Sequence, residues 1–352
     1  MQFEFSKVQD LTGTARREID AFLDSQDKSH PFQFPNWLGT ESAKAREKAY
    51  CATLREKQAL RWFALCGMSY PCSRLVPSIH SLTVYRGPVC DDPDLLVQGL
   101  QKLADHGLPK GVAYIDISPE WVEGDHTSLG AALATQGWEV LPGRRTSLRL
   151  DLSPGNEELF SSFRKATRYE IRRSQREGVE IRLAQNDQDL RAFQHIYREM
   201  AEKKKFPATE SKLLLNILRW FVKEQDRGAL LLAFKDRTLL GGTVVVRAAT
   251  RSWYVFGATT KEERLSAGHL LQWHAIRWAK ERACVEYDFG GYREDSNTGP
   301  ALFKRGFCQS MVHFVPTYRY VVNPRLYATV GRVGRGRSSL ASAAQRLLGR
   351  AH

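Results

Sequence analysis

Residues 302–307, with the sequence LFKRGF, carry a lysine and an arginine bracketed by aromatic side chains. A lysine held beside aromatic rings can become a fixed, partly desolvated cation. Such a cation can stabilise the oxyanion of an acyl-transfer reaction or hold a terminal phosphate. Lys304 is therefore a candidate catalytic residue. The alternative is a lysine that lies along apolar surface and keeps its ammonium group in water.

Residues 287–291, with the sequence YDFGG, are typical of a strand that ends in two glycines. Backbone N–H groups at glycines can approach a ligand closely, which makes Gly290 a candidate substrate-binding position. Asp288, at the carboxyl end of the strand, is a candidate acceptor for a substrate amine. The competing interpretation is a turn in which Asp288 bonds the local backbone.

The span Asn156–Arg176 predicts one long amphipathic helix. At about 100° per residue, its basic residues share one narrow face: Lys165, Arg168, Arg172 and Arg176. Residues of the opposite face are expected to be buried: Phe160, Phe163, Thr167 and Ile171. The basic stripe favours a phosphate-bearing or acidic partner. The alternative is a solvated face neutralised by neighbouring glutamates.

Bulk composition points in the same direction without deciding it. The chain has 352 residues, which predicts two domains, and a formal net charge of +13. That charge favours tRNA, pyrophosphate-bearing substrates or an anionic membrane surface as partners. Six cysteines without a C-x-x-C pair and nine histidines without ligand spacing predict neither a disulfide framework nor a metal site.

The chain also lacks the marks of export. No apolar run reaches the ~18–20 residues of a membrane-spanning helix, and the N-terminus is not a secretory signal. We therefore expect a cytoplasmic protein.

Strands and helices alternate along the chain, which predicts an α/β (α+β) layer architecture. In residues 1–150, we expect strands at Arg61–Leu65, His80–Tyr85, Val112–Ile117 and Arg145–Leu152 and helices at Asp94–Ala104 and Ser128–Gln136. In residues 151–324, the long helix precedes a strand at Val179–Leu183 and helices around Leu190–Glu202 and Lys212–Lys223. Three strands are expected next, at Ala229–Phe234, Leu240–Arg247 and Ser252–Gly257. A helix at Gly268–Arg282, a strand at Val285–Phe289, a short helix and one more strand complete the order. This second order resembles the acetyltransferase (GNAT) fold. The first half shows a similar but degraded order, so we expect two tandem GNAT-like domains, the second better preserved.

Residues 325–352 form a basic tail with six arginines and no acidic residue. Its apolar residues fall on one helical face: Leu340, Ala344, Leu347 and Leu348. One interpretation is a basic amphipathic segment that rests on anionic lipid. The other is a frayed, solvated terminus.

Five segments, taken in order, resemble the Fem family, whose members are non-ribosomal peptidyl transferases that add amino acids to peptidoglycan side chains. They are residues 167–173 (TRYEIRR) with 177–179, 253–258 (WYVFGA), 269–280 (HLLQWHAIRWAK), 287–291 (YDFGG) and 303–307 (FKRGF). The family's important lysine matches Lys304, with Phe303 beside it, and its strand tyrosine matches Tyr254. The resemblance gives a set of candidate substrate-binding residues: Arg168, Tyr169, Arg172, Tyr254, Gln272, Gly290 and Phe303.

The resemblance further implies an aminoacyl-tRNA donor, no other cofactor, and an acceptor amine on a sugar-peptide or lipid-linked precursor. It places the enzyme in the cytoplasm, at the inner face of the membrane if the tail binds there. Family members often carry lysines after the first-domain tryptophan, whereas Trp37 is followed by residues LGTE, so the acceptor stays open.

Two rival functions remain. An acyl-CoA-dependent N-acyltransferase shares the fold, and residues 264–268 (RLSAG) are a degraded match to the glycine-rich pyrophosphate loop of such enzymes. The other rival is a non-catalytic tRNA- or membrane-binding accessory protein.

Overall fold

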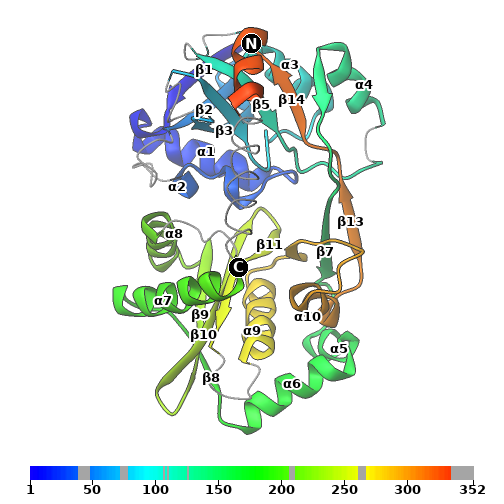
Figure 1. Ribbon diagram of the computed structural model, residues 1–352. Coiled ribbons are helices and arrows are strands. Elements are labelled where there is room, and N and C mark those ends of the chain that lie inside the picture. The colour runs from blue at the N-terminus through cyan, green and yellow to red at the C-terminus, as the bar shows by residue number, and fades with distance from the viewer. Residues whose placement is uncertain are drawn as a thin grey trace, which may run out of the picture. The chain divides into compact units, whose positions relative to one another are not determined.

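The computed structural model describes residues 1–38, 48–71, 78–105, 108, 111–124, 127–205, 211–260 and 267–333. The chain forms two compact units (Figure 1). Unit 1 comprises residues 1–19, 40–143 and 315–352, and unit 2 comprises residues 20–39 and 144–314. The chain therefore passes between the units more than once, whereas the sequence predicted a single boundary at residue 150.

Unit 1 contains a seven-stranded sheet in the order β1-β2-β3-β4-β5-β14-β6. Its strands are β1 (Gln2–Lys7), β2 (Lys48–Glu56), β3 (Ala59–Ser69), β4 (His80–Val84), β5 (Val112–Ile117), β6 (Trp138–Val140) and β14 (Tyr318–Val321). The pairing is antiparallel except between β4 and β5. The accompanying helices are η1 (Val8–Asp10), the first half of α1 (Gly13–Ser25), α3 (Pro93–Asp105) and α4 (Thr127–Thr135).

The core of unit 1 forms where α3 lies against the sheet. Leu96 and Leu100 of α3 and Trp62 of β3 are fully buried. A Cβ atom at Gly99 would lie 2.5 Å from the Trp62 ring, so only glycine lets the helix approach the indole this closely.

Unit 2 contains a second seven-stranded sheet, in the order β13-β7-β12-β11-β10-β9-β8. Its strands are β7 (Arg145–Asp151), β8 (Glu180–Leu183), β9 (Gly228–Lys235), β10 (Thr238–Ala248), β11 (Arg251–Thr259), β12 (Glu286–Gly291) and β13 (Met311–Phe314). Its helices are η2 (Pro31–Gln33), α2 (Pro35–Leu38), α5 (Asn156–Ser162), α6 (Lys165–Arg176), α7 (Asp187–Lys204), α8 (Ser211–Lys223), α9 (Ala267–Glu281) and α10 (Gly299–Phe307).

Helices cover the sheet of unit 2. Helix α9 lies along β9, β10 and β11 and contacts α6, and it buries Leu270, Trp273 and Ile276 in the core (Figure 1). Helices α7 and α8 pack on the same central strands, where Phe193 of α7 lies against Gly242 of β10. The predicted order of elements from residue 179 to residue 289 is confirmed.

Strands β11 and β12 pair over a short stretch. Their parallel register joins Arg251–Trp253 to Glu286–Asp288 and covers three residue pairs. Beyond it, β11 continues to Thr259 alongside β10, and β12 continues to Gly291. The ladder between these two strands therefore ends at Trp253 and Asp288.

The predicted helix 156–176 is wrong in one respect, because the structure has two helices with a break at Phe163 and Arg164. The N–H group of Arg164 donates to the carbonyl of Gly306 at 2.9 Å and so leaves the helical hydrogen-bond ladder. The guanidinium group of Arg168 donates to the carbonyls of Ser161 and Phe163, which satisfies the end of α5.

Three further expectations are corrected by strand pairing. The strand predicted to close the first domain is β7, and it pairs with β12 and β13 in unit 2. β14, predicted within the second domain, pairs with β5 and β6 in unit 1. Residues 31–38, predicted in the first domain, belong to unit 2, where α2 packs on α8.

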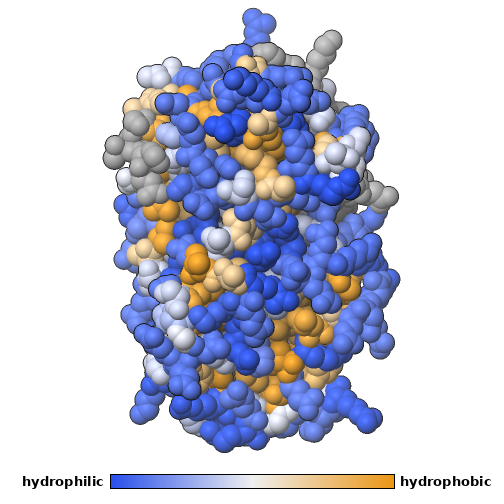
Figure 2. All heavy atoms as spheres, turned by 180° about the vertical axis from the view of Figure 1, so that it is seen from behind, coloured by the Kyte–Doolittle hydropathy of each residue, from blue (hydrophilic) through white to orange (hydrophobic). Residues whose placement is uncertain are grey.

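Hydrophilic residues cover most of the face drawn in Figure 2, with apolar side chains confined to separate areas. Among the described helices, none combines the length and the apolar character that crossing a membrane requires. Residues 324–333 are helical, and the apolar face predicted for the tail lies outside the described residues.

Candidate functional site

Lys304 is fixed on the end of β12. It lies in α10, and its Nζ donates to the carbonyl oxygens of Gly290, at 3.2 Å, and Gly291, at 2.7 Å. Gly290 has a φ of +71°, in the left-handed region that glycine adopts without strain. Two carbonyl dipoles aimed at one ammonium group stabilise its positive charge. These two hydrogen bonds fix the Lys304 side chain on the backbone at the end of β12.

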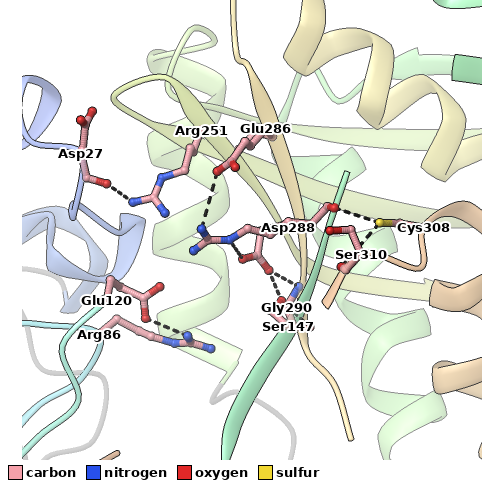
Figure 3. A network of polar contacts seen from close by, with 12 residues as sticks. Asp27, Arg86, Glu120, Ser147, Arg251, Glu286, Asp288, Gly290, Cys308 and Ser310 are labelled. Atoms are coloured by element: carbon pink, nitrogen blue, oxygen red, sulfur yellow. Dashed lines mark hydrogen bonds and ion pairs between the residues drawn. The ribbon is translucent and has the colours of Figure 1, made fainter. Parts of the chain in front are cut away.

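Asp288 is enclosed by donors, as Figure 3 shows for Ser147 and Gly290. Its Oδ1 accepts from the Ser147 hydroxyl and from the Gly290 N–H at 2.7 Å, and its Oδ2 accepts from Arg149 Nε at 3.0 Å. Only 2% of Asp288 is exposed. The geometry therefore favours a positioning role for this carboxylate over the predicted direct contact with a substrate amine.

Aromatic rings gather around Phe303, the residue that precedes Lys304 in α10. The Phe303 ring lies 5.0 Å from the His269 ring at the start of α9 and 5.3 Å from the Phe307 ring. A Cβ atom at Gly268 would lie within 4 Å of both Thr259 and Phe303. The end of β11, the start of α9 and α10 therefore meet in one place.

Tyr254 stands at the point where β11 leaves β12. Its carbonyl oxygen would lie 3.3 Å from a Cβ atom at Gly290, and its ring lies over Gly257. Burial raises the pKa of Tyr254 to about 12, so its hydroxyl stays protonated at neutral pH. It can act there as a neutral hydrogen-bond donor.

Gln272 does not share this site in the way the resemblance implied. It is 1% exposed, and its Nε2 donates to the Tyr287 hydroxyl at 2.6 Å. This buried pair satisfies two polar groups inside the core of unit 2. Its geometry supports a structural role.

The basic residues of α6 are mostly exposed. Tyr169 is 55% exposed, Arg172 is exposed with its guanidinium 5.1 Å from the centre of the Phe160 ring, and Arg168 is occupied at the end of α5. Phe163, Thr167 and Ile171 are buried, as predicted, whereas Phe160, which was also predicted to be buried, is partly exposed. The structure therefore brings Lys304, Asp288, Gly290 and Tyr254 together, and α6 packs against α10, the helix that carries Lys304 and Phe303.

Sequence reasoning missed Ser147 and Arg149, which hold Asp288, and His269. A signal for the first pair existed in residues 145–151 (RTSLRLD), where polar and apolar side chains alternate. The sequence of that strand does not indicate that its polar side chains contact Asp288.

The two partly buried histidines of α9 should make the fold sensitive to acid. Burial lowers the pKa of His269 and of His274 from 6.5 to about 4. The unfolded chain therefore binds these protons at higher pH than the folded chain, and the stability that the neutral rings contribute is complete above pH 6.5. It is lost as the pH falls from about 6.5 towards 4.

We expect His274→Gln, which lies outside the cluster around Lys304, to flatten this pH dependence. The measurement is the melting temperature at a series of pH values between 4 and 7. The same decline in the variant and the parent protein would contradict the assignment.

Comparisons with known proteins agree with this architecture. Residues 161–305 match the family model described as an acetyltransferase (GNAT) domain. The crystal structure of FemX superposes with a TM-score of 0.78 at 17% identity, covering 94% of this chain and 99% of that one. L-PGS from Bacillus licheniformis superposes with a TM-score of 0.57 at 12% identity, covering 95% and 99%.

Two curated relatives are similar in sequence. The UDP-N-acetylmuramoylpentapeptide-lysine N(6)-alanyltransferase of Weissella viridescens is 23% identical over 260 residues, which is 69% of this chain and 76% of that enzyme. The Lipid II:glycine glycyltransferase of Staphylococcus haemolyticus is 26% identical over 141 residues, 38% of this chain. The match spans 34% of the staphylococcal enzyme's length.

The fold and the relatives define an acyltransferase built from two tandem domains of the GNAT type. Within that class, the resemblance to the Fem family that the sequence predicted is confirmed.

Proposed function

We propose that this enzyme transfers an aminoacyl group from aminoacyl-tRNA to an amine of a peptidoglycan precursor or a related peptide or glycan intermediate. The observation that carries the proposal is the ammonium group of Lys304, held by the carbonyls of Gly290 and Gly291 at the end of β12. The names of the relatives supply the acceptor class, since one is an alanyltransferase and the other a glycyltransferase acting on cell-wall precursors.

The reaction is the aminolysis of an ester. The acceptor nitrogen attacks the carbonyl carbon of the aminoacyl ester, a C–N bond forms, and the C–O bond to the tRNA ribose breaks. The amine loses one proton, and the released ribose hydroxyl gains one. Negative charge develops on the carbonyl oxygen between these steps, and the Lys304 ammonium stabilises that charge. Because the ester is already activated, orientation of the two reactants supplies much of the acceleration.

The neighbouring residues receive matching roles. Tyr254 donates a hydrogen bond to substrate, because its hydroxyl stays protonated. Phe303 forms an apolar wall beside Lys304 that keeps water from the reacting ester. Gly290 brings its backbone close to the substrate, and Asp288 fixes the conformation of that turn.

The exposed basic face of α6 is proposed to contact tRNA phosphates through Lys165, Arg172 and Arg176. Each phosphate contact releases bound counterions, so the logarithm of the affinity falls with the logarithm of salt by about 0.9 per contact. We expect the double variant Arg172→Gln, Arg176→Gln to make this slope shallower by roughly 2. The measurement is filter binding of charged tRNA between 50 and 200 mM salt, a range over which phosphate-bound complexes weaken by orders of magnitude.

Arg191→Gln on α7 is the matched control, because its side chain is 66% exposed and lies on another helix. It should keep the parent slope. Equal slopes for the control and the α6 variant would remove α6 from the tRNA contact.

An acceptor at the membrane would bring the enzyme to the cytoplasmic face, where charged tRNA is present. We propose that residues 325–352, with their six arginines, add a peripheral contact with anionic lipid.

The function is tested by offering labelled aminoacyl-tRNA and, in parallel, labelled acetyl-CoA, with purified cell-wall precursors as acceptors. Label that moves from tRNA to the precursor supports the proposal, and fractionated tRNA pools then identify the amino acid. If label moves only from acetyl-CoA, the donor is an acyl-CoA and the enzyme is an N-acyltransferase of that kind. If label moves from neither donor, the result favours a non-catalytic accessory protein.

A further inference from the structure

Two side chains of β7 point to the same face of the unit 2 sheet and converge on Asp288. Residues 147 and 149 share a face because side chains alternate along a strand. Arg149 lies opposite Asp288 in the antiparallel register, and Ser147 lies opposite Gly291, with an irregularity in between. This irregularity gives β12 the turn at Gly290. The partners of Asp288 thus come from a strand about 140 residues away in the sequence.

The contacts form a continuous path to Lys304 within unit 2. Arg149 and Ser147 donate to the Asp288 carboxylate, which accepts from the Gly290 N–H. The Ser147 hydroxyl also lies 2.9 Å from the Gly290 carbonyl, which is one of the two oxygens that hold Lys304. The Ser147 hydroxyl of β7 thus lies directly beside the Gly290 carbonyl. The Gly290 N–H is linked to β7 through the Asp288 carboxylate.

This arrangement differs from ordinary burial of polar groups in the same sheet. Ser252 on β11 is fully buried, and its hydroxyl donates to the carbonyl of Glu286 at 3.0 Å, which links two strands. Ser147 instead contacts a buried carboxylate that holds a left-handed turn. Burying a charged pair is costly in free energy, so a pair at this turn suits a position that must be held accurately.

We propose that Ser147 and Arg149 are positioning residues of the transfer reaction, which hold Lys304 in place through Asp288 and the Gly290 turn. The proposal rests on the function proposed above for Lys304. In this proposal, the Asp288 carboxylate maintains the geometry of the site. Groups other than Asp288 accept the proton of the attacking amine. Misplacement of a reacting group by about 1 Å can cost about 10²-fold in rate, so loss of this support reaches the chemistry without touching substrate.

The test compares Ser147→Ala with Ser252→Ala, because each removes one buried serine hydroxyl from the same sheet. The first readout is kcat and KM for transfer from charged tRNA. We expect Ser147→Ala to lower kcat by about 10- to 100-fold with little change in KM, and Ser252→Ala to keep the parent kcat. Melting temperatures of both variants are measured in parallel, and comparable losses of stability make the comparison of kcat valid.

The second readout is independent of activity. The rate at which a small amine-reactive anhydride modifies Lys304 is measured by mass spectrometry of the folded protein. Release of the ammonium from Gly290 and Gly291 should speed the labelling of Lys304 in Ser147→Ala and in Asp288→Asn. It should leave the rate in Ser252→Ala unchanged.

The outcomes separate this proposal from the one it rests on. If Ser147→Ala behaves like Ser252→Ala in both kcat and labelling, the positioning role is wrong. If Lys304→Ala keeps full activity, the function proposed for the lysine fails. In that event the labelling rates alone decide whether β7 holds the turn.

Discussion

Replacing Lys304 with alanine is expected to lower kcat for aminoacyl transfer by about 10²–10³-fold, the usual cost of removing a fixed group that stabilises the oxyanion. The loss should appear in single-turnover transfer from charged tRNA, with the affinity for tRNA little changed. The physical reason is that the ammonium group acts on charge that exists only in the transition state.

Lys280→Ala is the matched control for this experiment. The Nζ of Lys280 also donates to two backbone carbonyls, those of Leu152 at 2.5 Å and Pro154 at 2.6 Å, but on another part of unit 2. It should cost stability and spare kcat. Equal loss of turnover in the two variants would mean that Lys304 serves the fold alone.

Replacing Arg149 with methionine is expected to lower the free energy of unfolding by about 3–5 kcal/mol, because it leaves a buried carboxylate without its cation. Arg149 is 8% exposed and Asp288 is 2% exposed, so water cannot replace the lost guanidinium. The measurement is denaturation by urea, monitored by tryptophan fluorescence.

The comparison variant is Arg277→Met, which breaks the pair between Arg277 and Glu281 in the same unit. The side chains of Arg277 and Glu281 are 42% and 61% exposed, so we expect a loss of about 0–1 kcal/mol. Adding Asp288→Asn to Arg149→Met should recover part of the lost stability, since it removes the unpaired charge. An Arg149→Met variant no less stable than Arg277→Met would rule out a buried pair of this strength.

Much of unit 2 could be predicted from the sequence because its signals are local. Continuous apolar runs at Ala229–Phe234 and Leu240–Arg247 predict buried strands, and the periodicity of Gly268–Arg282 predicts the helix between β11 and β12. The site lysine could be found for the same reason, since Phe303 and Phe307 flank it in the sequence.

What could not be predicted depends on partners distant in the chain. At the break at Phe163 and Arg164, the Arg164 N–H donates to the carbonyl of Gly306. No residue within 156–176 predicts this distant partner. Gln272 looks like a polar residue available to substrate until the fold places the Tyr287 hydroxyl beside it. In the sequence, Asp288 has the appearance of a free carboxylate, and only the fold shows that Arg149 of β7 donates to it.

The exchange of β7 and β14 bears on how such an enzyme can be divided or inherited. A gene cut after residue 150 would give two polypeptides, neither of which encodes a complete sheet. The first would lack β14, and the second would lack β7 together with the serine and the arginine that hold Asp288. The two sheets can therefore be completed only when both parts of the chain are made together.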